Sequence, residues 1–143
     1  MKAIRSELTT QQLVAHLQEA RARLLELVSD LDDQQMIGPR LATVNPLRWE
    51  IAHVAHFQEF WLLRHQRGHE PIKPAGNLDP DKLYDSARVH HDTRWDLPLP
   101  SKQATIDYTQ RILDRVCEEV LKNAAPPDAT GYDDNYFLHL SLL

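Results

Sequence analysis

Hydrophobic residues recur at helical spacing in the first part of the chain. Thr9 and Thr10 offer a helix cap, and the following positions predict an amphipathic helix of about 22 residues. Its apolar stripe consists of Leu13, Leu17, Ala20, Leu24, Leu27, Val28 and Leu31. Arg21 and Arg23 are expected on other faces. The pattern breaks over residues 32–44, where glycine and proline indicate a connecting loop.

A second helix is predicted from Pro46 to about Gln66, and it is apolar around most of its circumference. Asn45 is expected to cap its first turn, since proline suits the first helical position. One face, within an arc of about 80°, carries three aromatic rings and a histidine: Trp49, His53, Phe57 and Phe60. An imidazole on that face needs a polar partner, which is a metal ion, a backbone carbonyl or a buried water.

Glycines and prolines interrupt residues 68–100, which predicts a long loop with one short helix over residues 81–87. A loop of this length in a compact domain tends to be functional when it is ordered. Ser101 begins a third helix, and two prolines end it. Its apolar stripe consists of Ile106, Leu113, Val116, Cys117, Val120 and Ala124.

The stretch from Tyr136 to Leu143 predicts a fourth helix that is much shorter than the others and ends on bare leucines. Bundles need helices of matching length, because longer helices otherwise expose apolar surface. We therefore expect an all-α four-helix bundle over residues 1–143, with its fourth helix truncated, as one domain of a longer protein.

Composition narrows the function classes. The 143 residues are 42% hydrophobic and 26% charged, as in ordinary globular domains. The net charge of −5 and the lack of a basic run argue against a nucleic-acid partner. No apolar run reaches the length of about 18 residues that a membrane span needs. A single cysteine excludes an internal disulfide and favours a cytoplasmic location.

Several side chains are candidates for chemistry. His53 and His56 lie about 60° apart on the second helix, although two histidines rarely complete a metal shell. His56 is otherwise expected at the edge of the core, hydrogen-bonded to a loop. Arg94 stands between two aspartates and beside Trp95. That segment is either a loop clamp, with Arg94 in ion pairs and Trp95 plugging the bundle, or a site for an anionic substrate.

Three stretches carry a family resemblance, and together they cover nearly the whole chain: residues 45–59, residues 83–100 and residues 134–143. The first resembles the opening signature of the DinB-like N-terminal domain of ergothioneine-type sulfoxide synthases, with a tryptophan, a histidine four residues later, then an aromatic residue and a glutamate. The second, with Leu83-Tyr84-Asp85-Ser86-Ala87 and Arg94-Trp95-Asp96-Leu97-Pro98, looks closer to the selenoneine-synthase branch.

This resemblance implies a bundle that supplies a three-histidine site for non-haem Fe(II). In that family the enzyme uses oxygen to join sulfur or selenium to the imidazole carbon of trimethylhistidine (hercynine), and a second domain supplies much of the substrate pocket and a catalytic tyrosine. His53 matches the first iron ligand. The other two form a His-x-x-x-His pair expected directly after Leu143, so the chain as given is expected to be inactive and free of iron.

Four further residues are candidates for positions around the substrates of such an enzyme. Arg94 and Trp95 are candidates for contact with the thiol or selenol donor, while His56 and His139 are candidates for lining the site. The sequence leaves the choice between sulfur and selenium open. Two other readings stay open as well: a stand-alone DinB-like thiol transferase that uses zinc or nickel, and a non-catalytic helical module that dimerises through its apolar faces.

Overall fold

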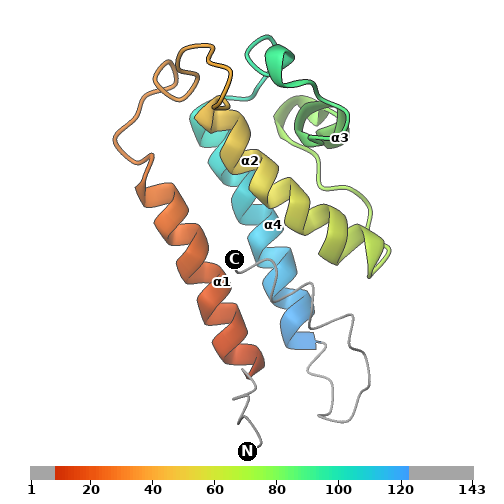
Figure 1. Ribbon diagram of the computed structural model, residues 1–143. Coiled ribbons are helices and arrows are strands. Elements are labelled where there is room, and N and C mark those ends of the chain that lie inside the picture. The colour runs from red at the N-terminus through yellow and green to blue at the C-terminus, as the bar shows by residue number, and fades with distance from the viewer. Residues whose placement is uncertain (1–8, 123–143) are drawn as a thin grey trace, which may run out of the picture.

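The computed structural model describes residues 9–122, and within this range the protein is all-α, as predicted. Three long helices, α1 (Thr10–Glu26), α2 (Leu47–Gln58) and α4 (Lys102–Lys122), form its frame (Figure 1). A π-helical segment, η1 (Glu59–His65), continues α2 without a break. The expected fourth helix, with His139, and Ala124 of the third stripe lie outside the described residues.

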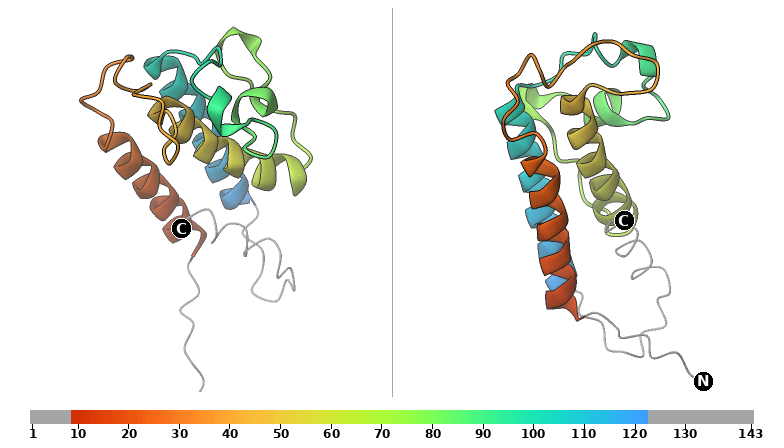
Figure 2. Two further views of the ribbon diagram at one scale, coloured as in Figure 1. Left: turned by 45° about the horizontal axis from the view of Figure 1, so that its top comes forward. Right: turned by 60° about the vertical axis from the view of Figure 1, so that its left-hand side comes forward.

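Three short elements occupy the long loop: η2 (Ala75–Asn77), α3 (Pro80–Tyr84) and η3 (His91–Thr93). The short helix predicted over residues 81–87 is therefore real but smaller. Asp79 caps α3, since its carboxylate accepts a hydrogen bond from the Asp81 N–H at 3.0 Å. Figures 1 and 2 show α3, the loop between α1 and α2 and the loop that leads into α4 gathered at one end of the long helices, beside the first turns of α2 and α4.

Helix α4 packs against both α1 and α2, and α3 packs against α2. Apolar side chains from α1, α2, α3 and α4 fill the main core. It includes Leu13, Leu17, Trp49, Leu83, Tyr84, Tyr108, Ile112, Val116 and Cys117. The stripe expected for the third helix is buried at Leu113, Val116, Cys117 and Val120. Burial also raises the pKa of the Cys117 thiol, so it behaves as a small hydrophobic residue.

Helix α1 begins as predicted and ends earlier. Thr9 and Gln12 form a capping box, in which each side chain accepts a hydrogen bond from the other's backbone N–H. The helix stops at Glu26, and Leu27 is 77% exposed, so the prediction that it belongs to the core stripe was wrong. Val28 is buried beyond the helix end, in a second small cluster with Met36 and Ile51.

The prediction that Arg21 lies on a face other than the buried one was wrong. Its side chain is 5% exposed and links three helices. One guanidinium nitrogen donates to the Thr109 carbonyl of α4 at 2.7 Å, and the other donates to the Gln58 side chain of α2 at 2.7 Å. Burial lowers the pKa of Arg21 to about 10. A long aliphatic stem lets an arginine cross an apolar stripe, which a hydrophobicity pattern does not register.

Asn45 does not cap α2, contrary to expectation. Pro46 occupies the cap position, and no side chain caps that end. The Asn45 amide instead donates to the Glu50 carboxylate at 2.6 Å and accepts from Arg94 at 2.7 Å. It therefore ties the start of the helix to the long loop.

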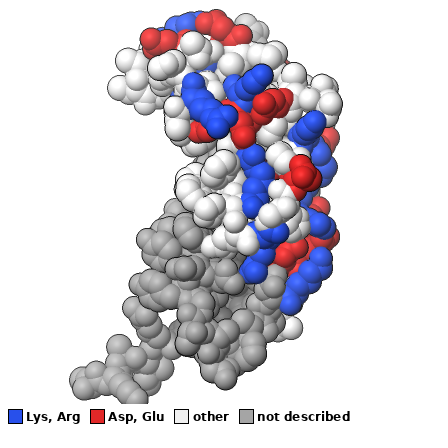
Figure 3. Space-filling model, turned by 90° about the vertical axis from the view of Figure 1, so that its right-hand side faces the viewer, with Lys and Arg blue, Asp and Glu red and all other residues white. Residues whose placement is uncertain are grey.

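The surface of the described range carries mixed charge. Figure 3 shows acidic and basic side chains interspersed over one face. No helix among residues 9–122 is both long and apolar enough to cross a bilayer.

Candidate metal-ligand site around His53

The half-buried His53 ring has a fixed hydrogen-bond partner on one side. Its Nδ1 lies 2.8 Å from the carbonyl oxygen of Tyr84, the last residue of α3. A carbonyl only accepts, so Nδ1 carries a proton, and in the neutral ring Nε2 is then the nitrogen with the lone pair. Within residues 9–122 no hydrogen bond reaches Nε2. Nε2 is thus a nitrogen in a fixed orientation that is available as a metal ligand.

Trp49 holds the same ring from a second direction. Its indole stacks on the His53 imidazole with ring centroids 4.6 Å apart and planes 14° from parallel. The indole N–H donates to the Leu83 carbonyl at 2.6 Å. Two stacked rings on α2 therefore bind two successive carbonyls at the end of α3. Of the aromatic face expected on this helix, Phe57 is 49% exposed and Phe60 contacts His56 and Trp61 instead.

His56 also binds α3, at Asp81, which lies one turn before Tyr84. It is 3% exposed, and its Nε2 lies 2.8 Å from the Asp81 carboxylate, so Nε2–H donates to that group. Burial lowers the pKa of His56, which keeps the ring neutral at pH 7. The two histidines of the His-x-x-His pair thus face different atoms of one short helix. In this structure they do not converge on a common centre.

Arg64 and Glu59 of η1 complete a chain of charges beside this contact. The Arg64 guanidinium donates to both oxygens of Asp81, at 2.6 and 3.1 Å, and lies 3.1 Å from the Glu59 carboxylate. Glu59 is 0% exposed, and one of its oxygens has no hydrogen-bond partner in the described part of the chain. Burial raises the pKa of Glu59 to about 7, whereas the Arg64 contact lowers the pKa of Asp81 to about 2.

Arg94 clamps the loop by contacts that differ from those expected. Its guanidinium donates to Asn45 at 2.7 Å and to the Val89 carbonyl at 3.0 Å, and it lies 3.9 Å from the centre of the Trp49 ring. It makes no ion pair with the neighbouring aspartates; Asp96 pairs with Arg40 at 2.6 Å instead. Arg94 thus clamps the loop as one of the two expectations had it, but by hydrogen bonds and a contact with the Trp49 ring and not by ion pairs with the aspartates.

Trp95 is half-buried and does not plug the bundle. It packs on His91, with ring centroids 5.1 Å apart, and the Arg40 guanidinium lies 5.6 Å from its ring centre. Its indole N–H is buried and has no hydrogen-bond partner among the described residues. The ring therefore belongs to the loop layer that covers the end of the bundle.

A metal ion fits the free nitrogen of His53. Metal-bound histidines usually donate their other N–H to a carbonyl or carboxylate, which fixes the tautomer, and neutral imidazole suits Fe(II). Residues 9–122 contain no cluster of three or more His, Cys, Asp or Glu side chains able to hold a metal. The described residues thus offer one well-oriented ligand and do not complete a site by themselves.

The sequence analysis placed Tyr84 and Glu59 in the family signatures without giving either a role, and it did not single out Asp81 or Arg64. The Tyr84 contribution is a backbone carbonyl, which no side-chain pattern reports. Glu59 and Arg64 are five residues apart, while helix patterns pair residues three or four apart. A π-helical segment brings such a pair together, and no sequence signal for it was recognised.

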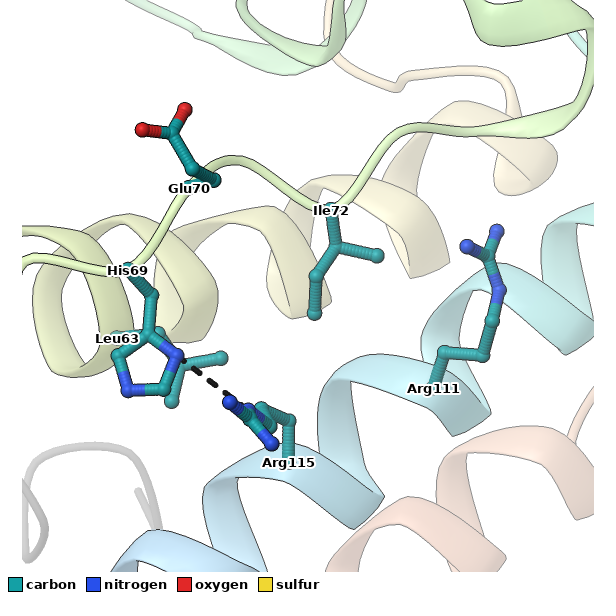
Figure 4. Close-up of a pocket in the computed structure, with 6 residues that line it drawn as sticks. All are labelled: Leu63, His69, Glu70, Ile72, Arg111 and Arg115. Carbon is teal, nitrogen blue, oxygen red and sulfur yellow. Dashed lines mark hydrogen bonds between the residues drawn. The ribbon is translucent and has the colours of Figure 1, made fainter.

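A separate open hollow of about 500 Å³ lies between η1 and α4 (Figure 4). Arg111 and Arg115 border it, but their guanidinium groups are already engaged. Arg111 donates to the Lys73 carbonyl, while Arg115 donates to His69 and pairs with Glu118. Glu70 points away from the other lining side chains. Among the described residues that line this hollow, no free polar groups converge.

Comparison with known proteins agrees with this architecture. The DinB superfamily matches residues 16–135. A Mycobacterium tuberculosis protein named hercynine oxygenase is 34% identical over 124 residues, which are 85% of this chain and 28% of that protein. A Mycolicibacterium thermoresistibile protein of the same name is 38% identical over 92 residues, which are 63% of this chain and 20% of that protein.

The chain thus spans less than a third of the length of these relatives. The superfamily match, in contrast, extends over most of the chain and includes α2, α3 and α4. The chain belongs to the DinB superfamily.

Proposed function

We propose that this chain is the metal-ligand-bearing helical domain of an oxygen-dependent enzyme that acts on hercynine, with Nε2 of His53 as one ligand. The observation that carries the proposal is the bond from Nδ1–H to the Tyr84 carbonyl, which leaves Nε2 as a free donor. The relatives named hercynine oxygenase support the substrate class.

In this proposal the metal is Fe(II), which supplies oxygen activation for joining the hercynine imidazole carbon to sulfur or selenium. His53 contributes a neutral nitrogen, and Trp49 and Tyr84 fix the plane and tautomer of its ring. The remaining ligands lie outside residues 9–122. The short match to the relatives supports a larger enzyme in which another domain completes the substrate pocket.

Contact with the thiol or selenol donor is the less constrained part of the proposal. Arg94 is 9% exposed, and its terminal nitrogens already bind Asn45 and Val89. Trp95 is half-buried beside it, with an indole N–H that has no partner in the described range. Each residue keeps one buried N–H without a partner in the described range, Nε of Arg94 and Nε1 of Trp95, as the group for a bound donor molecule to engage.

The test is anaerobic Fe(II) binding by the complete product of the gene. His53→Ala should weaken binding by more than about 100-fold, since losing a ligand costs more than losing the partner of a ligand. His16→Ala, which removes an exposed histidine of α1, is the matched control and should bind as the wild type does. Iron held equally well without His53 would overturn the proposal.

Metal analysis and sizing of the same samples distinguish this proposal from the two alternative hypotheses. Zinc or nickel in the active protein, with no oxygen consumed, would favour the thiol transferase. A stable dimer without metal would favour the non-catalytic module.

A further inference from the structure

We infer that Asp81 is a positioning residue for His53. It holds α3 where the Tyr84 carbonyl accepts the Nδ1–H of the imidazole, and it thereby decides which ring nitrogen remains free. The inference rests on the proposed role of His53 as a ligand. It concerns the state of the His53 ring, which can be measured without metal.

Helix α3 cannot hold its own position. It has five residues, and helices this short are unstable without tertiary contacts. The Asp79 cap is local and fixes only the first turn. Whatever places the last residue, Tyr84, must therefore reach α3 from another element.

The Asp81 carboxylate supplies that anchor. It accepts hydrogen bonds from Arg64 of η1 at 2.6 and 3.1 Å and from His56 of α2 at 2.8 Å. Bonds between charged groups are about twice as strong as neutral ones. The Asp81 side chain is only 20% exposed, so water competes little for these contacts.

The two contacts are related by helical spacing. Asp81 and Tyr84 are three residues apart on α3, and their partners His56 and His53 are three residues apart on α2. Each pair of residues therefore lies about one turn apart on its own helix. If the Asp81 contact is removed, the contacts in the described range that still hold the end of α3 beside His53 are the Trp49 bond to the Leu83 carbonyl and core packing.

The experiment measures the His53 tautomer by imidazole ¹⁵N chemical shifts in the metal-free chain at about pH 8, where histidines are neutral. The wild type should show His53 as the Nδ1–H form. In Asp81→Ala the ratio of the Nδ1–H form to the Nε2–H form should fall about five-fold, the effect of losing one ordinary hydrogen bond. Asp81→Glu should restore part of the ratio.

Lys82→Ala is the matched control, because Lys82 is exposed on the same short helix. If Asp81→Ala does not fold, as judged by circular dichroism, Asp81→Asn takes its place, since it keeps the shape and loses the charge. A folded Asp81 variant with the wild-type ratio overturns the inference, and so does an equal shift in Lys82→Ala. If iron binding proved independent of His53 while the tautomer shifted as expected, the proposed function alone would fail.

Discussion

The imidazole of His53 lies nearly parallel to the indole of Trp49, with ring centroids 4.6 Å apart. Both rings come from α2, four residues apart, and both donate to backbone carbonyls of α3. Because each stacked ring makes a hydrogen bond to α3, the geometry of the stack depends on this short helix, which is distant in the sequence.

Replacing Trp49 by phenylalanine should keep most of the ring and remove its N–H. The Leu83 carbonyl would then be buried without that partner, and we expect a loss of about 1–2 kcal/mol in the free energy of unfolding. Urea denaturation followed by circular dichroism measures the loss. Trp95→Phe is the control, because its N–H has no partner in the described range and its removal should be close to neutral.

Arg21 should be essential for stability in spite of its charge. Arg21→Ala removes two hydrogen bonds of 2.7 Å and the packing of a buried stem, so the free energy of unfolding should fall by about 2–4 kcal/mol. Arg23→Ala on the same helix, whose side chain is 76% exposed, should stay within about 0.5 kcal/mol of the wild type. Equal effects of the two substitutions would contradict the buried position of Arg21.

Glu59 should make the protein less stable as the pH rises. Its pKa is raised by burial to about 7 in the folded state from an ordinary value of 4.5. Between these values the folded state binds more protons than the unfolded state, so stability falls with rising pH and stays lower above pH 7. Over this pH range we expect the free energy of unfolding to fall by about 2–3 kcal/mol.

Glu59→Gln should abolish this part of the pH profile, as measured by urea unfolding at several values between about pH 5 and 8. Glu19→Gln, at an exposed position of α1, should retain the wild-type slope. A slope that is unchanged in Glu59→Gln would show that another group causes the pH dependence.

Arg94 should be sensitive even to a conservative change. Lysine keeps the charge but cannot bind Asn45 and Val89 together, so Arg94→Lys should cost about 1–3 kcal/mol. Thermal or urea unfolding would detect this loss. Arg88→Lys, in the same loop and 66% exposed, should have little effect. If Arg94→Lys is neutral, Arg94 is not a loop clamp.

The long helices could be predicted from the sequence because apolar periodicity reports directly which side of a helix is buried. The helix starts followed from capping residues and proline beside that periodicity: Thr9 for α1, Pro46 for α2 and Ser101 for α4. The early end of α1 did not. Leu27 and Val28 both fit the stripe, and only the path of the following loop decides that Val28 is buried and Leu27 is not.

The surroundings of His53 were less predictable, because they depend on atoms that a sequence pattern does not describe. The histidine itself was found from its place among aromatic residues. Its partner is a main-chain oxygen of Tyr84, and the anchor of that segment is a carboxylate of Asp81 that binds a π-helical arginine. Such contacts join elements that are far apart along the chain, so local spacing carries no record of them.

The π-helical turns of η1 set how far apart in sequence Glu59 and Arg64 can lie and still face the same side of the segment. In an ordinary α-helix, residues five apart point about 140° away from each other, whereas the wider turns of η1 bring these two groups to within 3.1 Å. Deleting one residue between them would leave a spacing of four, which an α-helix keeps on one face. We therefore expect this ion pair to survive the loss of one codon better than the gain of one, and urea unfolding of the two variants would show the difference.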